Sequence, residues 1–133
     1  MNETKIKTKV LVVDDDPNLN TVLVDKLNAS GFEAIGASNG PLGIEKAFSF
    51  HPDIILLDLI MPGMDGFEVL KRIRSDEWGN KVKIIMLTLI DKIDSIAQAV
   101  ENNVSGYLVK TNYSLDGIVK EINSILNKSQ SKI

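Results

Sequence analysis

The sequence contains no cysteine and only one histidine, His51. The missing cysteines exclude disulfides, thiolate metal sites and cysteine nucleophiles. A single histidine excludes a metal site built from several imidazoles. No apolar run approaches the roughly 20 residues that a membrane-spanning helix needs. Residues 1–9 are polar and lack the apolar stretch of a signal peptide. We therefore expect a cytoplasmic protein with no membrane contact.

An excess of positive charge is also missing, since the net charge of the 133 residues is −3. Such a chain has no basic field to attract nucleic acid, and we expect no direct contact with it. The apolar share of 44% and charged share of 25% are ordinary for a globular protein. The length fits one domain with one hydrophobic core. We place that domain at residues 9–127, with a polar extension at 1–8 and a polar tail at 128–133.

Five short apolar runs recur along the chain, and each is followed by a segment with helical spacing. The runs are Val10–Val13, Phe32–Ala37, Ile54–Leu57, Ile84–Leu87 and Tyr107–Val109. Most of them are continuous rather than alternating, which indicates strands that are buried on both faces. Strands of this kind belong to a parallel sheet that lies between two layers of helices.

Apolar stripes at helical spacing mark the segments between these runs. The stripes are Leu19, Val22, Leu23 and Leu27; Phe67, Leu70 and Ile73; Ile93, Ile96, Ala97 and Val100; and Leu115, Ile118, Val119, Ile122, Ile125 and Leu126. The helix at 41–50 is the least regular, because Gly43 lowers its helix propensity. Asp16 before Pro17 is typical of a helix start, and Asp65 with Glu68 has capping-box spacing. The order predicts an α/β fold: a (βα)5 doubly wound three-layer sandwich around a five-stranded parallel sheet.

Polar side chains close four of the five predicted strands. They are Asp14 and Asp15, then Asp58, Thr88 and Lys110. In an open parallel sheet the carboxyl ends of the strands form the ligand site, so these groups meet at one edge. Three crowded carboxylates repel one another unless a cation lies between them. Hard oxygen ligands without histidine or thiolate favour Mg²⁺.

This set of groups supports phosphoryl transfer. Asp58 is the best nucleophile, because it is central and is followed by a turn-rich loop at 59–66. The metal ion and the Lys110 ammonium would neutralise charge on the phosphoryl group, and the Thr88 hydroxyl could donate a hydrogen bond to it.

Two segments, residues 10–17 (VLVVDDDP) and residues 53–66 (DIILLDLIMPGMDG), resemble the signatures of two-component response-regulator receiver domains. The resemblance covers the chain from about Lys9 to Leu126. It implies a flavodoxin-like sheet with strand order 2-1-3-4-5. It also implies a signalling switch, not an enzyme that turns over an external substrate.

The resemblance also implies a role for each matching residue. Asp58 would be the phosphoacceptor, phosphorylated by the phosphohistidine of a sensor kinase or phosphotransfer protein. Mg²⁺ would bind to Asp15, Asp58 and the backbone carbonyl of Ile60, with Asp14 acting largely through water. Thr88 and Lys110 would contact the phosphoryl group. Tyr107 would change rotamer, although a plain core aromatic is about equally compatible with its position.

The same resemblance locates an output face on the helix at 91–103, the strand of Tyr107 and the last helix. This face would control a partner or an output domain, and phosphorylation-dependent homodimerisation is common in such proteins. The sequence does not separate a stand-alone receiver from a piece of a longer regulator.

Simpler roles account for several other polar and aromatic residues. Asp16 and Asp65 are explained as helix caps, so we leave them out of the site. His51, before Pro52, is expected at the surface or as a cap. Trp78 lies in a polar loop, and we assign it no function.

Four residues depart from the receiver pattern. Leu89 follows the switch threonine, where the family has a small residue, and would narrow access to the phosphoryl group. Thr111 stands where the family most often has a cis proline, so a trans peptide or a reshaped loop is expected. Ile60 and Ile90, two residues beyond Asp58 and Thr88, are both apolar. We expect them to exclude an attacking water and to prolong the phosphorylated state.

Two alternatives stay open at the sequence level. Asp14 and Asp16 superficially provide the Asp-x-Asp pair of a haloacid-dehalogenase-like phosphatase. Against this reading, the chain is short, Asp16 is explained by a helix start, and the loop after Asp58 would have no role. The other alternative is a degenerate receiver that keeps the fold as a docking module without phosphorylation. Leu89 and Thr111 favour it slightly, while the intact acids and Lys110 weigh against it.

Overall fold

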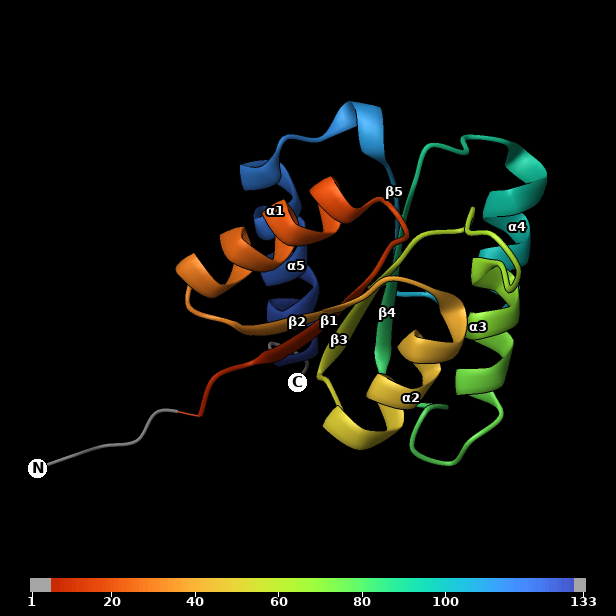
Figure 1. Cartoon of the computed structure of the whole chain (residues 1–133), viewed down its shortest axis with the longest axis horizontal. Helices are drawn as coiled ribbons and strands as arrows, with labels where there is room; N and C mark the ends of the chain where they lie inside the picture. The colour runs from red at the N-terminus through yellow and green to blue at the C-terminus, as the bar shows by residue number, and fades with distance from the viewer. Residues whose placement is uncertain (1–5, 131–133) are drawn as a thin grey trace, which may run out of the picture.

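A computed structural model describes residues 6–130, with side chains up to Lys128, as one parallel sheet between two layers of helices (Figure 1). The strand order β2-β1-β3-β4-β5 confirms the predicted (βα)5 doubly wound fold. In chain order the elements are β1 (Lys9–Val13), α1 (Pro17–Ala29), β2 (Glu33–Ala37), α2 (Gly40–Phe50), β3 (Ile54–Leu57), α3 (Gly66–Arg74), β4 (Lys83–Thr88), α4 (Ile93–Glu101), β5 (Gly106–Val109), the 3₁₀ helix η1 (Lys110–Asn112) and α5 (Leu115–Gln130).

The sheet has a separate hydrophobic core on each face. Helices α1 and α5 cover one face, where Leu23, Leu27 and Ile122 pack on Val12 and Leu56. Helices α2, α3 and α4 cover the other face in a second buried cluster. That cluster includes Leu11, Ile55, Leu57, Ile84, Met86, Leu70, Ile73 and Ala99. Consecutive strand residues therefore feed opposite cores, which explains the continuous apolar runs.

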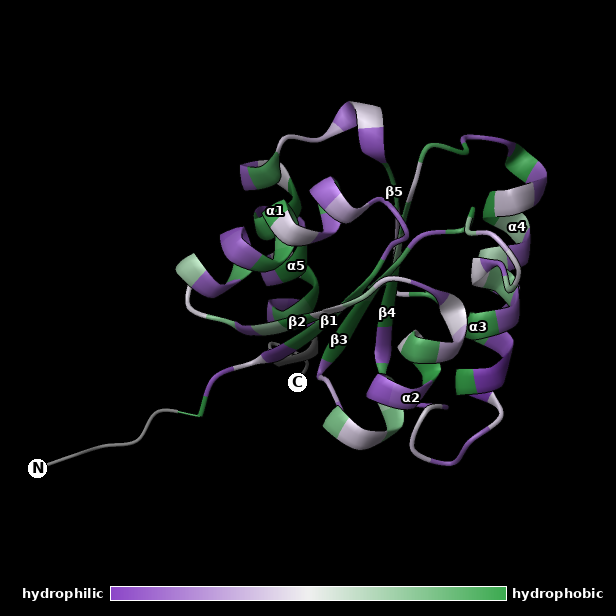
Figure 2. Ribbon diagram, in the orientation of Figure 1, coloured by the Kyte–Doolittle hydropathy of each residue, from purple (hydrophilic) through white to green (hydrophobic). Residues whose placement is uncertain are grey.

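In Figure 2 the strands of the sheet are mostly hydrophobic, whereas the helices carry hydrophobic and hydrophilic residues in turn along their length. Within residues 6–130, none of the helices combines the length and apolar character that crossing a bilayer requires.

The predicted helix starts are confirmed by their hydrogen bonds. The Asp16 carboxylate accepts hydrogen bonds from the backbone N–H groups of Asn18 (3.1 Å) and Leu19 (3.4 Å). Asp65 and Glu68 form a reciprocal capping box at the start of α3. Both aspartates stabilise helix ends, as expected from their spacing.

Gly43 is required by close packing between α2 and β1. A Cβ atom built at this position would lie 2.8 Å from Cγ1 of Val13, closer than real Cβ contacts come. Val13 is itself buried, so it has little room to move. The glycine lowers helix propensity, but its missing side chain lets α2 approach the strand whose end carries Asp14.

Helix α4 is shorter than predicted, and its apolar stripe faces outward. It spans Ile93–Glu101 rather than residues 91–103. Ile93 is 81% exposed and Val100 is 61% exposed, whereas the small side chain of Ala99 is fully buried. Helical spacing identified the helix correctly but did not identify which face packs on the sheet. The other difference lies at α5, which continues to Gln130 and so includes part of the predicted tail at 128–133; residues 131–133 lie outside the described chain.

Candidate functional site

Strand register brings the predicted site residues to one edge of the sheet. Val13 is paired with Leu57 in the parallel ladder, so Asp14 and Asp58 leave the sheet side by side. The backbone N–H of Asp58 donates to the carbonyl of Val13 at 3.0 Å, which fixes the relative position of the two strand ends.

The pairing of β4 with β5 likewise brings Lys110 to the same edge of the sheet as the acids. On the other side of the sheet centre, Thr88 is paired with Val109, the residue before Lys110. The five predicted residues Asp14, Asp15, Asp58, Thr88 and Lys110 all line one hollow of about 230 Å³.

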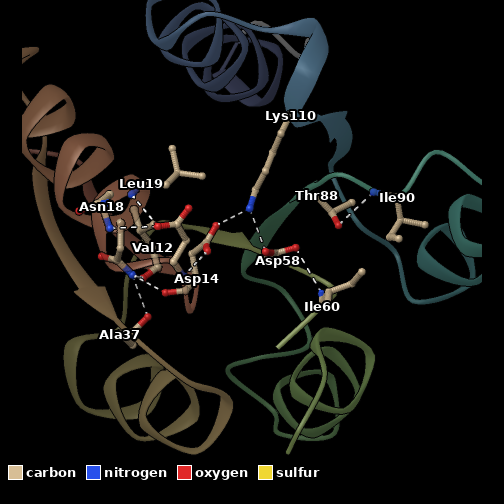
Figure 3. Close-up of polar contacts among 12 residues, drawn as sticks. Val12, Asp14, Asn18, Leu19, Ala37, Asp58, Ile60, Thr88, Ile90 and Lys110 are labelled. Atoms are coloured by element: carbon tan, nitrogen blue, oxygen red, sulfur yellow. Dashed lines mark hydrogen bonds and ion pairs between the residues drawn. The ribbon is translucent and has the colours of Figure 1, made fainter. Parts of the chain in front are cut away.

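The Lys110 ammonium bridges two carboxylates in this hollow (Figure 3). Its Nζ lies 2.8 Å from Oδ2 of Asp14 and 2.9 Å from Oδ2 of Asp58. The side chains of Asp14 and Asp58 are only 3% and 7% exposed, and that of Lys110 is 15% exposed. A buried carboxylate is costly without a partner, so one cation stabilises two anions that would otherwise repel each other.

Burial and pairing shift two pKa values in this cluster. Burial raises the pKa of the Asp14 carboxyl, and it outweighs the lowering effect of the hydrogen bond from Lys110. Burial lowers the pKa of the Lys110 ammonium, but hydrogen bonds to Asp14 and Asp58 overcome this and raise it above the ordinary value. Lys110 is therefore cationic throughout the physiological pH range.

Three carboxylates of this edge could hold a metal ion together. Each of Asp14, Asp15 and Asp58 offers an oxygen, and these oxygens lie within 4.8 Å of one another. Asp15 is half-buried, while the other two are buried. Three hard oxygen donors beside a single ammonium fit Mg²⁺, which commonly binds through a few carboxylates and keeps several waters. The backbone N–H of Ile60, two residues further along the chain, donates to Oδ1 of Asp58 at 3.3 Å, and this local contact helps to orient the carboxylate.

Thr88 and Tyr107 both contact the loop between β4 and α4. The Thr88 hydroxyl oxygen accepts a hydrogen bond from the Ile90 N–H at 3.4 Å, and the residue is fully buried. The Tyr107 hydroxyl donates to the Ile90 carbonyl at 2.7 Å. Burial raises the pKa of the Tyr107 phenol, and the negative charges of Asp91 and Asp58 act in the same direction. Thr88 and Tyr107, the two predicted switch residues, thus bind the N–H and the carbonyl of the same residue, Ile90.

Apolar side chains border the hollow. Ile60 (57% exposed) and Leu89 (61% exposed) both line it, so large hydrocarbon groups stand at its mouth. Ile90 lines a neighbouring groove of about 360 Å³, together with Ile60, Met61 and Phe67. Leu89, expected to narrow access, and Ile60, expected to exclude water, both line the hollow. Ile90, which the sequence paired with Ile60, lines the neighbouring groove instead.

The departure at Thr111 has a simple structural outcome. No cis peptide bond occurs within residues 6–130, so the Lys110–Thr111 bond is trans as expected. The chain turns there through the 3₁₀ helix η1, which begins at Lys110 itself. Lys110 still reaches both carboxylates without the proline.

One residue near the hollow, Asn20, was not identified from the sequence. The side-chain amide of Asn20 donates to the carbonyls of Asp14 (2.9 Å) and Ala37 (2.9 Å), which orders the loop that carries the acids. Its targets are backbone atoms, which sequence patterns do not reveal. Asp16 lines the hollow as well, although its carboxylate caps α1.

The aromatic residues at the opposite edge of the sheet have a packing role. His51 ends α2 in the left-handed conformation (φ 48°), which confirms its expected place as a surface cap. Its ring stacks on Trp78, with centroids 4.5 Å apart.

The comparisons with known proteins identify the family. Residues 10–123 match the response regulator receiver domain, and the chain belongs to that family. It is 29% identical over 121 residues to the DNA-binding dual master transcriptional regulator RpaA of Synechocystis, a match that covers 91% of this chain and 50% of RpaA. It is 35% identical over 105 residues to the response regulator PleD of Caulobacter vibrioides, covering 79% of this chain and 23% of PleD.

Solved structures agree with this family. The chemotaxis protein CheY4 of Vibrio cholerae is 28% identical, with a TM-score of 0.85 and coverage of 90% of this chain and 99% of that one. The chain spans half or less of the length of RpaA and PleD. The chain is thus a receiver domain of the two-component response-regulator type.

Proposed function

We propose that this receiver domain is switched by phosphorylation of Asp58. The observation that carries the proposal is the Lys110 ammonium, which lies 2.8 and 2.9 Å from two buried carboxylates at the centre of the sheet edge. An ion pair that served stability alone could be replaced by apolar side chains, often without loss of stability. A cation beside a nucleophilic carboxylate is the arrangement that phosphoryl transfer requires.

In the proposed reaction a carboxylate oxygen of Asp58 attacks the phosphorus of a phosphohistidine on a sensor kinase or phosphotransfer protein. The new O–P bond forms as the N–P bond breaks, and the electron pair leaves with the imidazole nitrogen. Lys110 stabilises negative charge on the transferred group, and the Thr88 hydroxyl can donate a hydrogen bond to it. The step is a single transfer onto the protein, so we propose no turnover of an external substrate.

Mg²⁺ bound at this edge would supply further positive charge and orient the phosphoryl oxygens. Asp15 and Asp58 are the proposed direct ligands, with the backbone carbonyl of Ile60, and Asp14 is proposed to act through water. The closeness of the three carboxylates supports this assignment. Lys110 forms ion pairs with only two of these three carboxylates, Asp14 and Asp58, so the bound ion would supply the charge that the cluster still needs.

The proposed switch acts through Ile90. Thr88 accepts a hydrogen bond from its N–H, and Tyr107 donates to its carbonyl, so a change at either side chain alters the loop before α4. We propose that the face formed by α4, β5 and α5 then contacts a protein partner or an output domain, and homodimerisation is one form of that contact. The exposed Ile93 and Val100 on α4 support a protein-contact surface there.

The phosphatase alternative is less well supported. Its second acid would be Asp16, whose carboxylate accepts backbone hydrogen bonds at the start of α1. A docking module without phosphorylation leaves the buried ammonium and acids without a role.

Amide NMR spectra of the protein with Mg²⁺, before and after addition of acetyl phosphate, would test the switch. We expect shifts at residues 88–97 and 106–110 that decay as the phosphoryl group is lost. Asp58→Asn, as the control, should show none of them. Shifts that persist in Asp58→Asn, or an unchanged wild-type spectrum, would contradict the proposal.

A further inference from the structure

Among the residues that the structure describes, Arg74, the last residue of α3, donates hydrogen bonds only to backbone carbonyls. Two of them lie beyond the end of α4, and two belong to the loop between α3 and β4. The distances are 2.9 Å from Nε to Asn102 O, 3.0 Å from Nη2 to Asn103 O, and 2.6 and 2.7 Å from Nη1 to Gly79 O and Val82 O. One side chain thus ties three segments together.

No carboxylate forms an ion pair with Arg74 anywhere in residues 6–130. The side chain is partly buried, and burial lowers the pKa of its guanidinium. Its charge is compensated by carbonyl oxygens, of which two stand at the negative end of the α4 dipole. The rigid fork of an arginine can serve four acceptors in one plane, which a lysine cannot do.

The C-terminal end of α4 is closed by several further hydrogen bonds. The Asn102 side chain donates to Gln98 O at 3.0 Å, and the Asn103 N–H donates to Val100 O at 3.0 Å. Asn103 adopts the left-handed conformation with φ 59°. Local bonds therefore end the helix, and Arg74 fastens that end to α3.

The N-terminal end of α4 is held differently. Lys92 occupies the N-cap position and makes no side-chain capping bond. Ile93 is 81% exposed, so its side chain contributes little packing. The preceding loop depends on the contacts of Thr88 and Tyr107 with Ile90. One end of α4 is thus tied to α3, whereas the other depends on the residues at the phosphorylation site.

We propose that Arg74 is a positioning residue that makes the C-terminal end of α4 a fixed pivot. A change at Thr88 and Tyr107 then swings the N-terminal half of α4 and leaves its C-terminal end in place. This inference rests on the proposed function, because phosphorylation supplies the change. It adds a residue on the far side of the molecule that determines how the change reaches the surface.

Hydrogen–deuterium exchange on the full chain, with and without acetyl phosphate and Mg²⁺, tests the pivot. Intact mass confirms the adduct in each sample. In the wild type, phosphorylation should change exchange at residues 90–96 and leave residues 99–104 unchanged. In Arg74→Met, amide exchange at residues 99–104 should become about tenfold faster even in the unphosphorylated protein. The reason is that local unfolding of the end of α4 becomes easier once the Arg74 hydrogen bonds are lost. Phosphorylation should then alter exchange along the whole helix.

Two further variants keep the test decisive. Arg72→Met removes an exposed arginine from the same helix, and it should behave as wild type. Arg74→Lys keeps the positive charge but loses the forked guanidinium, so its exchange rate at residues 99–104 should rise less than that of Arg74→Met. This variant replaces Arg74→Met in the test if Arg74→Met does not fold. Two outcomes overturn the inference and leave the proposed function standing. One is a phosphorylated wild type in which exchange changes equally at both ends of α4. The other is exchange like that of the wild type in both Arg74 variants. Absence of any adduct overturns the proposed function and the inference with it.

Discussion

Lys110 Nζ lies 2.9 Å from Oδ2 of Asp58, although 52 residues separate the two in the sequence. The contact joins the ends of β3 and β5, which are separated in the sheet by β4. It makes Lys110 both a stabilising partner of the resting site and the group that we expect to contact the phosphoryl oxygens. These two roles can be separated experimentally.

Replacing Lys110 by alanine should destabilise the resting protein and increase its response to Mg²⁺. The buried Asp14 and Asp58 carboxylates lose charge-assisted hydrogen bonds, at a cost of about 2 kcal/mol in the free energy of unfolding. Mg²⁺ should bind and restore more stability than it adds to the wild type, because ligand binding stabilises the folded state. Urea unfolding with and without Mg²⁺ measures both effects.

Lys92→Ala, at an exposed position, provides the matched control for Lys110→Ala and should unfold like the wild type. Lys110→Ala should also show smaller spectral shifts on phosphorylation. Equal Mg²⁺ responses in wild type and Lys110→Ala, or an unchanged stability, would argue against the bridging role.

Replacing Ile60 by asparagine should shorten the life of the phosphorylated state. Ile60 lines the hollow and is 57% exposed, so its hydrocarbon group is placed to keep water from the phosphoryl group. A polar side chain that can bind a water should speed hydrolysis about tenfold, which corresponds to a barrier lower by about 1.4 kcal/mol. Time-resolved intact mass after removal of the phosphodonor measures the decay.

The matched control for this substitution is Ile93→Asn, at an 81% exposed position that does not line the hollow. Leu89→Ala should shorten the lifetime as well, since Leu89 stands at the same mouth. A wild-type half-life of seconds, or no effect of Ile60→Asn, would contradict water exclusion.

Replacing Tyr107 by phenylalanine should remove a pH-dependent stabilisation. The neutral phenol donates to the Ile90 carbonyl, and the pKa of this group is raised above 10.0 in the folded protein. A raised folded pKa means that the contribution is complete below pH 10 and is lost as the pH rises towards the folded value. The unfolding free energy of the wild type should therefore exceed that of Tyr107→Phe by about 1 kcal/mol at neutral pH.

The difference between wild type and Tyr107→Phe should shrink above pH 10. Chemical unfolding at a series of pH values measures it, with Tyr113→Phe as the control for the other tyrosine. A difference that grows with pH would show that the hydroxyl does not act as a neutral donor.

The sequence predicts the sheet well because a strand that is buried on both faces has apolar residues at every position, and such a run is easily recognised. Continuous runs such as Ile54–Leu57 leave little choice but a central parallel strand, and the polar residues that close them must then meet at one edge. Asp58 and Lys110 could thus be placed together before any coordinates. Caps at Asp16 and Asp65 were equally readable, since their partners lie within the next three residues.

The rest depends on long-range geometry that residue types do not record. Helical spacing could not show that the stripe of Ile93 and Val100 points to solvent. The expected place of Leu89 beside the phosphoryl group agrees with the hollow, but the path of the loop after Thr88 decides that its neighbour Ile90 does not line it. Arg74 binds backbone carbonyls, which are the same at every residue, so no pattern in the sequence reveals its partners.

Intact-mass spectrometry after incubation with acetyl phosphate and Mg²⁺, followed by peptide mapping, tests the central claim most directly. We predict one added phosphoryl group on Asp58, absent when Mg²⁺ is chelated and absent from Asp58→Asn. A folded wild-type protein that takes up no phosphoryl group, or takes it up on another residue, would contradict the assignment of Asp58.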